Sequence, residues 1–144
     1  MLRVAVIAFL FLWGNAMANE LAIGHVKNVS GDAFVTTGGK KTKADIGSPI
    51  QQGSVLETGK KSSMGVIFKD ETVMSFGADT VFTVDEYSYA PAEKKLKFGS
   101  KLAKGSLNYV SGVIEKLKPD AVTVGTPSGV IGVRGTQFLL RVEE

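Results

Sequence analysis

Apolar and polar residues alternate in short runs along most of this chain, and glycine-rich turns separate the runs. Residues 64–68 and 73–76 alternate on either side of Asp70-Glu71-Thr72, which is the pattern of a β-hairpin. Turn residues recur at intervals of roughly 8 to 12 positions, and no segment keeps a helical apolar period. The pattern predicts an all-β fold, either a rolled β-sandwich or a barrel of short strands, with a short β-helix as the alternative.

Three segments need separate predictions. Residues 85–95 are polar, and we expect them to form the longest loop. Residues 113–117 fit either a strand or one helical turn. Residues 122–142 combine two β-rich runs with a sharp turn around Arg134-Gly135-Thr136.

The first residues read as a secretory signal peptide. Arg3 precedes an apolar run over residues 4–13, and Ala16-Met17-Ala18 supplies the small residues that a signal peptidase reads. The run is shorter than the ~20 apolar residues needed to span a bilayer, so an uncleaved membrane anchor is the weaker alternative. We therefore expect cleavage after Ala18, one all-β domain over residues 19–144, and a periplasmic or secreted location without stable membrane insertion.

Charge and cysteine content narrow the possible partners. The chain carries a net charge of +3, and loss of Arg3 with the signal peptide leaves +2 (16 basic and 14 acidic residues). A balance this close to neutral argues against nucleic acid as the main partner. The chain has no cysteine, so an exported domain of this length must be stabilised by its core alone.

Two segments share one frame of nine residues. Residues 47–55 and 99–107 both read Gly-Ser-x-apolar-x-x-Gly-Ser-apolar at an offset of 52, and downstream the offset becomes 56, which places Thr80 opposite Thr136. An ancient duplication explains the match. The alternative is chance recurrence of glycine-serine turns in a glycine-rich β protein.

The chain resembles the FecR-type domain, named for the iron-dicitrate transport regulator. Its most specific part is Thr126-Pro127 followed by Arg134-Gly135-Thr136 and Phe138. The other residues that carry the resemblance are Gly24-His25-Val26, Gly31-Asp32-Ala33, Gly47, Gly53, Thr58-Gly59, Asp70 and Thr80. The resemblance covers nearly all of residues 19–144.

This resemblance implies an all-β periplasmic or secreted module without known catalysis. In the regulator, the domain relays a signal from an outer-membrane receptor to a cytoplasmic sigma factor. This sequence departs from that design, since it shows no anti-sigma region and no spanning segment, and a link to sigma-factor signalling therefore stays open. It also carries Glu71 where the family often has glycine, which predicts a longer or bulged hairpin turn.

Arg134 is the sharpest candidate for a functional side chain. With Gly135, Thr136, Thr126 and Pro127 it forms a candidate corner that is either structural or partner-binding. A guanidinium group binds carboxylates through two hydrogen bonds. We favour the structural interpretation, in which Arg134 binds turn carbonyls or an acid such as Asp79 or Asp120.

The remaining chemistry is sparse. His25 is the only histidine, so it cannot form a two-histidine metal site, and nothing in the local sequence pairs it with a serine nucleophile. Asp70 and Glu71 form a hairpin tip, and adjacent acids in one turn are expected to be solvated. We expect no catalytic residues, no metal and no cofactor.

Three functions remain open. The leading hypothesis is a non-enzymatic interaction or sensory module whose partner is another protein of the cell envelope. The second is a structural accessory subunit or scaffold of an envelope complex. The third is a carbohydrate-active or hydrolytic enzyme, which would need acids that converge on a cleft.

Overall fold

The computed structural model describes residues 21–143, and the predicted signal peptide lies outside them. The described residues are mostly strands, which confirms the predicted all-β fold. The strands are β1 (Gly24–Ser30), β2 (Ala33–Thr37), β3 (Lys40–Lys43), β4 (Pro49–Ile50), β5 (Val55–Thr58), β6 (Ser63–Phe68), β7 (Val73–Phe76), β8 (Val81–Ala90), β9 (Lys95–Val110), β10 (Val122–Thr126), β11 (Gly129–Gly132) and β12 (Gln137–Val142).

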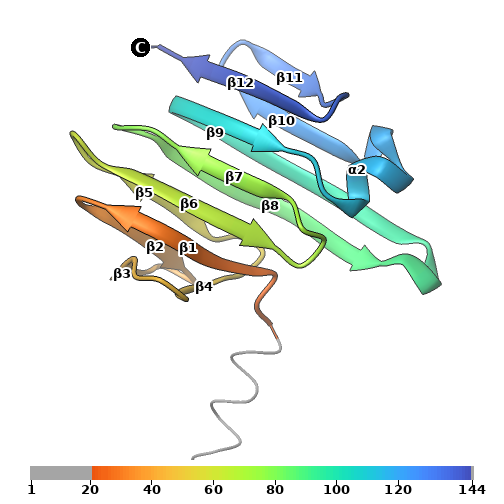
Figure 1. Cartoon of the computed structure of the whole chain (residues 1–144), viewed down its shortest axis with the longest axis horizontal. Helices are drawn as coiled ribbons and strands as arrows, with labels where there is room; N and C mark the ends of the chain where they lie inside the picture. The colour runs from red at the N-terminus through yellow and green to blue at the C-terminus, as the bar shows by residue number, and fades with distance from the viewer. Residues whose placement is uncertain (1–20, 144) are drawn as a thin grey trace, which may run out of the picture.

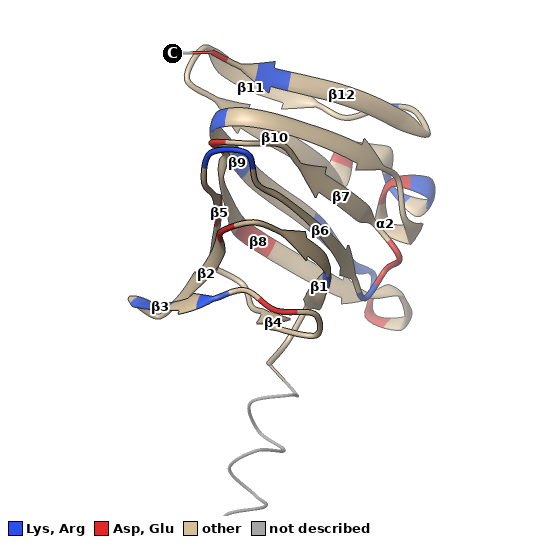
Figure 2. Ribbon diagram, turned by 60° about the vertical axis from the view of Figure 1, so that its left-hand side comes forward, with Lys and Arg blue, Asp and Glu red and all other residues tan. Residues whose placement is uncertain are grey.

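The strands form one hydrogen-bonded sheet that curls into a half-barrel (Figures 1 and 2). Its main path runs β3-β2-β5-β8-β9-β7-β6-β1-β4. Strands β10 and β12 also pair with β9, and β11 pairs with β10. In Figure 1, β3 and β4 therefore lie at one end of the molecule, and β11 and β12 lie at the other.

Strand β9 joins the two halves of the curled sheet. Its first part pairs with β8 and, in parallel, with β10. Its last six residues pair with β12, and the last four of these also pair with β7. Between the two parts, Gly105 has a φ of +95°, and a Cβ there would lie 2.4 Å from the Cα of Thr80. Glycine is thus required where β9 crosses from one half to the other.

Side chains on the inner face of the curled sheet make a continuous apolar core, because alternate residues of most strands point inward; β3 and β11 are exposed throughout. One part is an aromatic cluster at the end of β6, where Phe98 packs edge-on against Phe68 (4.8 Å between ring centres) and Tyr87 (4.9 Å). Strand β9 supplies Phe98, so this strand fills the core as well as pairing with its neighbours.

A single segment closes the N-terminal end of the half-barrel. Strand β3 covers the outer edge of β2, and β4 covers part of the outer edge of β1. The connecting residues add backbone bonds: the N–H of Gly47 donates to the carbonyl of Val26 (2.8 Å), and the N–H of Val26 donates to the carbonyl of Ser48 (2.9 Å). One stretch of chain thereby bridges the two sheet edges at this end.

The prediction of a long loop over residues 85–95 is wrong. Strand β8 continues to Ala90, and only the 3-10 turn η1 (Pro91–Glu93) and Lys94 separate it from β9. A bulge between Val84 and Glu86 shifts the register of β8 against β9. The inward residues Val84 and Tyr87 are therefore three positions apart, which hides the alternation.

Residues 113–117, which fitted a strand or a helical turn, form the short helix α2 (Val113–Leu117). A second 3-10 turn, η2 (Pro119–Ala121), follows and leads into β10. These turns carry the chain from the end of β9 back along it to the parallel pairing of β10 (Figure 1).

The two predicted repeat segments pair in the same way, with one adjustment of register. Leu56 of β5 lies opposite Phe82 of β8, and Tyr109 of β9 lies opposite Phe138 of β12. Strands β8 and β12 thus keep the predicted offset of 56. Strands β5 and β9 correspond at an offset of 53, so Val55 aligns with Asn108 rather than with Leu107.

Candidate functional site

We use the name C-terminal edge for the outer edges of β11 and β12. Among the described residues, β11 hydrogen-bonds only to β10, and β12 only to β9. Both carry exposed apolar side chains: Val130 is 75% exposed, Leu139 74% and Ile131 38%. An unpaired strand edge offers a row of N–H and C=O groups to another chain, and apolar side chains beside it favour that pairing.

An open pocket of about 310 Å³ lies between the β10–β11 hairpin and β12. Ile131 lines it from β11, Leu140 and Val142 line it from β12, and Thr126 and Pro127 line it from the hairpin turn. The pocket therefore separates the two free strands. Leu140 and Val142 pack against the core, whereas Ile131 is exposed.

Arg134 lies in the turn between β11 and β12. One guanidinium nitrogen donates to Asp120 Oδ1 at 3.3 Å, so the acid is one of the two proposed from the sequence. The side chains of both residues are more than four-fifths exposed (81% and 82%). Exposed ion pairs contribute little to stability, typically less than about 1 kcal/mol, so this pair holds the corner only weakly.

Backbone groups hold the corner more firmly than Arg134 does. The N–H of Gly135, which has a φ of +121°, donates to the buried carboxylate of Glu115 at 2.9 Å. The N–H of Ser111 donates to the carbonyl of Thr136 at 2.9 Å. The corner is thus tied to α2 and to the end of β9, and the Arg134 side chain points to solvent.

Thr126 and Pro127 lie at the opposite end of β10 from this corner. They begin the two-residue turn of the β10–β11 hairpin, where Thr126 Oγ1 donates to the carbonyl of Gly129 at 3.0 Å. The sequence grouped these residues with Arg134, Gly135 and Thr136, but the hairpin keeps the two sets apart. Thr126 and Pro127 border the pocket of the C-terminal edge, whereas Arg134 does not.

The β6–β7 turn has the bulged form that Glu71 predicted. The N–H of Glu71 donates to the carbonyl of Phe68 (2.9 Å), and the N–H of Phe68 donates to the carbonyl of Thr72 (2.9 Å). Glu71 itself is exposed and has a φ of +71°. Such a three-residue loop places its last residue in the left-handed conformation, where glycine is the least strained.

The expectation that both acids of this tip are solvated is wrong for Asp70, which is 0% exposed. Its Oδ1 accepts a hydrogen bond from the Tyr87 hydroxyl (2.9 Å). Its Oδ2 accepts bonds from Thr72 Oγ1 (2.7 Å) and from the N–H of Ile114 (3.1 Å). Asp70 therefore ties the hairpin tip to β8 and to the start of α2. Its partners lie up to 44 residues away, so no local signal revealed its burial.

Two tyrosines border this network. Burial raises the pKa of Tyr87 above its ordinary value, and the charge of Asp70 raises it further. Burial also raises the pKa of Tyr109, with added effects from Glu115 and Asp70. The Tyr109 hydroxyl is buried and has no protein partner, whereas the Tyr87 hydroxyl bonds to Asp70. A hydrogen bond thus offsets the cost of burying the Tyr87 hydroxyl, whereas no protein hydrogen bond offsets that cost for the Tyr109 hydroxyl.

The N-terminal edge, by which we mean β3 and β4, differs in composition from the C-terminal edge. Strand β3 consists of Lys40, Lys41, Thr42 and Lys43, all exposed, and Figure 2 shows its basic colouring. Strand β4 has two residues, the first of which is Pro49. Lysines, proline and short length are the usual means of preventing strand addition. The N-terminal edge has all three.

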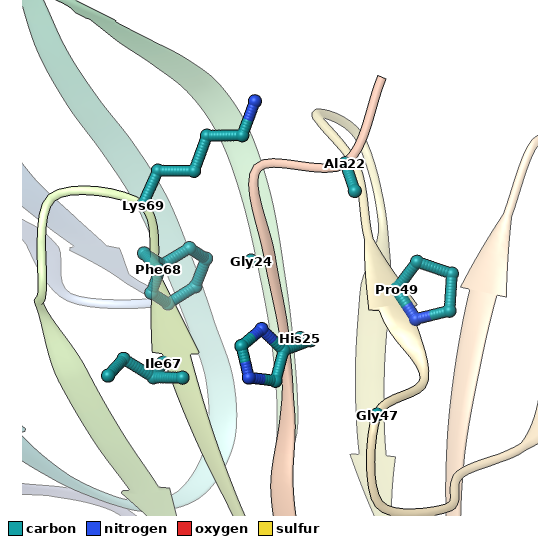
Figure 3. A pocket seen from close by; sticks show the side chains of 8 residues that line it. All are labelled: Ala22, Gly24, His25, Gly47, Pro49, Ile67, Phe68 and Lys69. Carbon is teal, nitrogen blue, oxygen red and sulfur yellow. The ribbon is translucent and has the colours of Figure 1, made fainter. Parts of the chain in front are cut away.

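A pocket of about 370 Å³ lies near the N-terminal edge, between β1, β4 and the end of β6 (Figure 3). His25, Phe68 and Lys69 line it together with Ile67, Pro49 and small residues. His25 is exposed in β1, opposite Ile67 and Pro49. No acid lines this pocket, so His25 has no carboxylate there to orient it as a base.

Within residues 21–143, no three acidic or histidine side chains come close enough together to hold a metal ion. Over the same residues, no helix has the length and apolar character to cross a membrane. Asp85 and Glu86 border an open pocket of about 250 Å³ with Lys97, and Glu86 is paired with Lys97 at 2.8 Å.

A family model described as FecR protein matches residues 54–144. The chain belongs to the FecR family. This confirms the resemblance inferred from the sequence over residues 54–144, and the match does not extend to the glycines at 24, 31, 47 and 53. The match begins at β5, so the part shared with the FecR family comprises both hairpin-containing halves, from β5 to β8 and from β9 to β12.

Strands β1 to β4, including the N-terminal edge, precede the matched part of this FecR chain. No curated protein and no solved structure matches the chain. The function of the FecR part must therefore be inferred from its own geometry. The C-terminal edge is the most distinctive surface of that part.

Proposed function

We propose that this FecR-family chain is an exported, non-enzymatic module of the cell envelope that binds a partner protein through its C-terminal edge. The observation that carries the proposal is the contrast between the two ends of the half-barrel. The N-terminal edge carries lysines and a proline, whereas the C-terminal edge carries Val130, Ile131 and Leu139 beside unpaired backbone groups. Edges kept apolar and unpaired are binding surfaces for extended chains.

Binding is favoured over catalysis by the state of the carboxylates. The two buried acids, Asp70 and Glu115, already accept hydrogen bonds from the fold. The exposed pair Asp85 and Glu86 is adjacent in one strand, whereas hydrolysis of a glycosidic bond needs two acids on opposite sides of the bond. These arrangements support a structural role for the buried acids.

An exported location is supported by family membership and by the leader-like residues 1–18. N-terminal sequencing of the chain recovered from the periplasm or the medium tests it. We expect the exported chain to begin at Asn19. A chain that retains Arg3 and stays in the cytoplasm would contradict export.

Site-specific cross-linking in intact cells tests the binding surface. A photoreactive amino acid at position 139 is expected to yield an adduct with one envelope protein. The matched control places the same group at Ile46, which is equally exposed (78%) but lies next to the N-terminal edge. Equal labelling from both positions, or none from position 139, would contradict the proposal.

Co-purification separates the sensory form of the proposal from the scaffold alternative. A scaffold subunit is expected to remain with its partner through purification without any added ligand. A sensory module is expected to bind or release its partner when conditions in the envelope change. The cross-linked protein provides the antibody target for both measurements.

A further inference from the structure

The two halves of the FecR part share the pairing of their first and last strands, although the parallel pairing of β10 with β9 has no counterpart between β6 and β5. All three residue pairs between β5 and β8 recur between β9 and β12, at offsets of 53 and 56. The hydrogen bond beyond those pairs recurs as well: Thr58 N–H donates to the Thr80 carbonyl (3.0 Å), and Ser111 N–H donates to the Thr136 carbonyl (2.9 Å). Each unit then holds a hairpin, β6–β7 in the first and β10–β11 in the second.

The corner before the last strand of each unit is also shared. Asp79, just before Thr80, has a φ of +52°, and Gly135, just before Thr136, has a φ of +121°. Both corners therefore use a residue with positive φ to turn the chain into the final strand. The correspondence extends from strand pairing to the sign of φ at this corner.

In the first unit, strand β9 covers the outer edges of both β8 and β7. It pairs antiparallel with β8, crosses at Gly105, and continues antiparallel to β7. At the crossing, the N–H of Ser106 donates to Thr80 Oγ1 (3.1 Å). Near its start, β9 places Phe98 between the hairpin tip and β8, against Phe68 and Tyr87.

In the second unit, every corresponding position is uncovered within residues 21–143. The outer edges of β12 and β11 are unpaired, and Thr136 is exposed. The pocket of about 310 Å³ lies between the hairpin tip and β12, where Phe98 lies in the first unit. The C-terminal edge thus has the shape of the first unit without its covering strand.

We propose that one extended segment of the partner protein occupies on the second unit the place that β9 occupies on the first. The inference rests on the proposed function and specifies the kind of partner. The segment pairs antiparallel with β12, crosses over Thr136 at a glycine, and continues antiparallel to β11. It places an aromatic side chain in the pocket and alternating apolar residues beyond the glycine, as Phe98, Leu107 and Tyr109 do in β9.

Charge further defines the segment. In the first unit, Glu86 of β8 is paired with Lys97 of β9. At an offset of 56, Glu86 corresponds to Val142, and its neighbour Asp85 corresponds to Arg141. The second unit thus carries a base where the bulge of β8 carries an acid, and the partner is expected to carry an acid near the position where β9 carries a lysine. A second copy of this chain offers no such free strand, because its β9 is already paired on both edges.

A fluorescent synthetic peptide tests the inference. Its sequence copies residues 95–110 with Lys97→Glu, and its binding to the chain that begins at Asn19 is followed by fluorescence anisotropy. We expect saturable binding that weakens by about tenfold or more in Ile131→Lys, since a charge then lies in the pocket. Ile46→Lys is the matched control, and we expect it to leave binding unchanged.

A change in the peptide alone tests the crossing without altering the protein. The same peptide with Gly105→Val is expected to lose binding by about tenfold or more, because β9 tolerates no Cβ at the crossing. Equal binding of the two peptides, or equal binding to Ile131→Lys and wild type, would overturn the inference. So would a dimer in analytical ultracentrifugation that dissociates in Ile131→Lys, since the occupant would then be a second copy.

The outcomes separate this inference from the proposed function. An adduct at position 139 without peptide binding would retain the binding function and reject a β9-like partner. Peptide binding without an adduct in cells would support the inference that the C-terminal edge accepts a β9-like segment. It would reject the proposal that this edge binds an envelope protein in cells.

Discussion

The two units of the FecR part pair their first and last strands in the same register but differ in what covers them. In the first unit, β9 lies across both β8 and β7, and the hairpin tip at Asp70 is buried. In the second unit, β11 and β12 have one neighbour each, and the hairpin tip at Pro127 is exposed. Exposure of apolar residues at the C-terminal edge therefore follows from the absence of a covering strand among the described residues. The strand order of the unit does not by itself require these apolar residues to be exposed.

The hairpin tips should show the largest difference between the units. Asp70→Ala removes the acceptor for Tyr87, Thr72 and the N–H of Ile114, and leaves buried donors unsatisfied. We expect the free energy of unfolding in urea to fall by about 3 kcal/mol or more. Thr126→Ala at the second tip removes an exposed bond and should lower it by less than about 1 kcal/mol. Similar losses for both variants would contradict the comparison.

Alkaline pH should distinguish the two buried tyrosines. The raised pKa values of Tyr87 and Tyr109 mean that the folded state keeps protons which the unfolded chain loses above about pH 10. Their contribution to stability is complete below that pH and declines as the pH rises further.

Phenylalanine variants separate the two side chains. At neutral pH, Tyr87→Phe should lower the free energy of unfolding by about 1 to 3 kcal/mol, because the bond to Asp70 is lost. Tyr109→Phe removes a hydroxyl without a protein partner and should leave that energy equal or higher. Both variants should show a smaller alkaline decline than wild type in urea titrations. A decline unchanged in both would contradict the assignment.

The first hairpin turn carries strain that a single change should relieve. Glu71 has a φ of +71°, and its side chain is exposed. We expect Glu71→Gly to raise the free energy of unfolding by about 0.5 to 1 kcal/mol, measured by urea denaturation. Glu71→Ala is the control, since alanine shares the positive-φ penalty. An equal gain from alanine would point to the charge instead of the backbone.

The smallest effect is expected at Arg134, which has no charged counterpart in the first unit. Arg134→Ala removes an exposed pair with Asp120, and we expect a loss of less than about 1 kcal/mol. A double-mutant cycle with Asp120→Ala measures the coupling directly. A coupling of several kcal/mol would restore Arg134 as the main clamp of the corner.

Much of the fold could be predicted from local patterns, because alternation and turn residues report strand pairing directly. The β6–β7 hairpin, the bulged turn at Glu71 and the partner Asp120 for Arg134 were all within reach of the sequence. Strand β8 was cut short in the prediction, since its bulge places Val84 and Tyr87 three residues apart. Alternation is a reliable signal only where the register is regular.

The candidate site was harder to predict because it depends on distant residues. The burial of Asp70 is decided by Tyr87 and Ile114, which lie 17 and 44 residues away. Thr126 and Arg134 are close in sequence, but the β10–β11 hairpin carries them to opposite ends of β10. The C-terminal edge itself could not be predicted. A strand lies at an edge when it has only one neighbour in the sheet, and the number of neighbours depends on the pairing of segments far apart in the sequence.

Strand β9 has a consequence for how this chain unfolds. It provides hydrogen-bond partners to β7, β8, β10 and β12, so neither unit retains its sheet if β9 leaves. The two units are therefore expected to unfold in one cooperative step despite their resemblance to a tandem array. In hydrogen exchange, the amides of β9 should open only with the whole molecule, whereas those of β11 should exchange through local fraying.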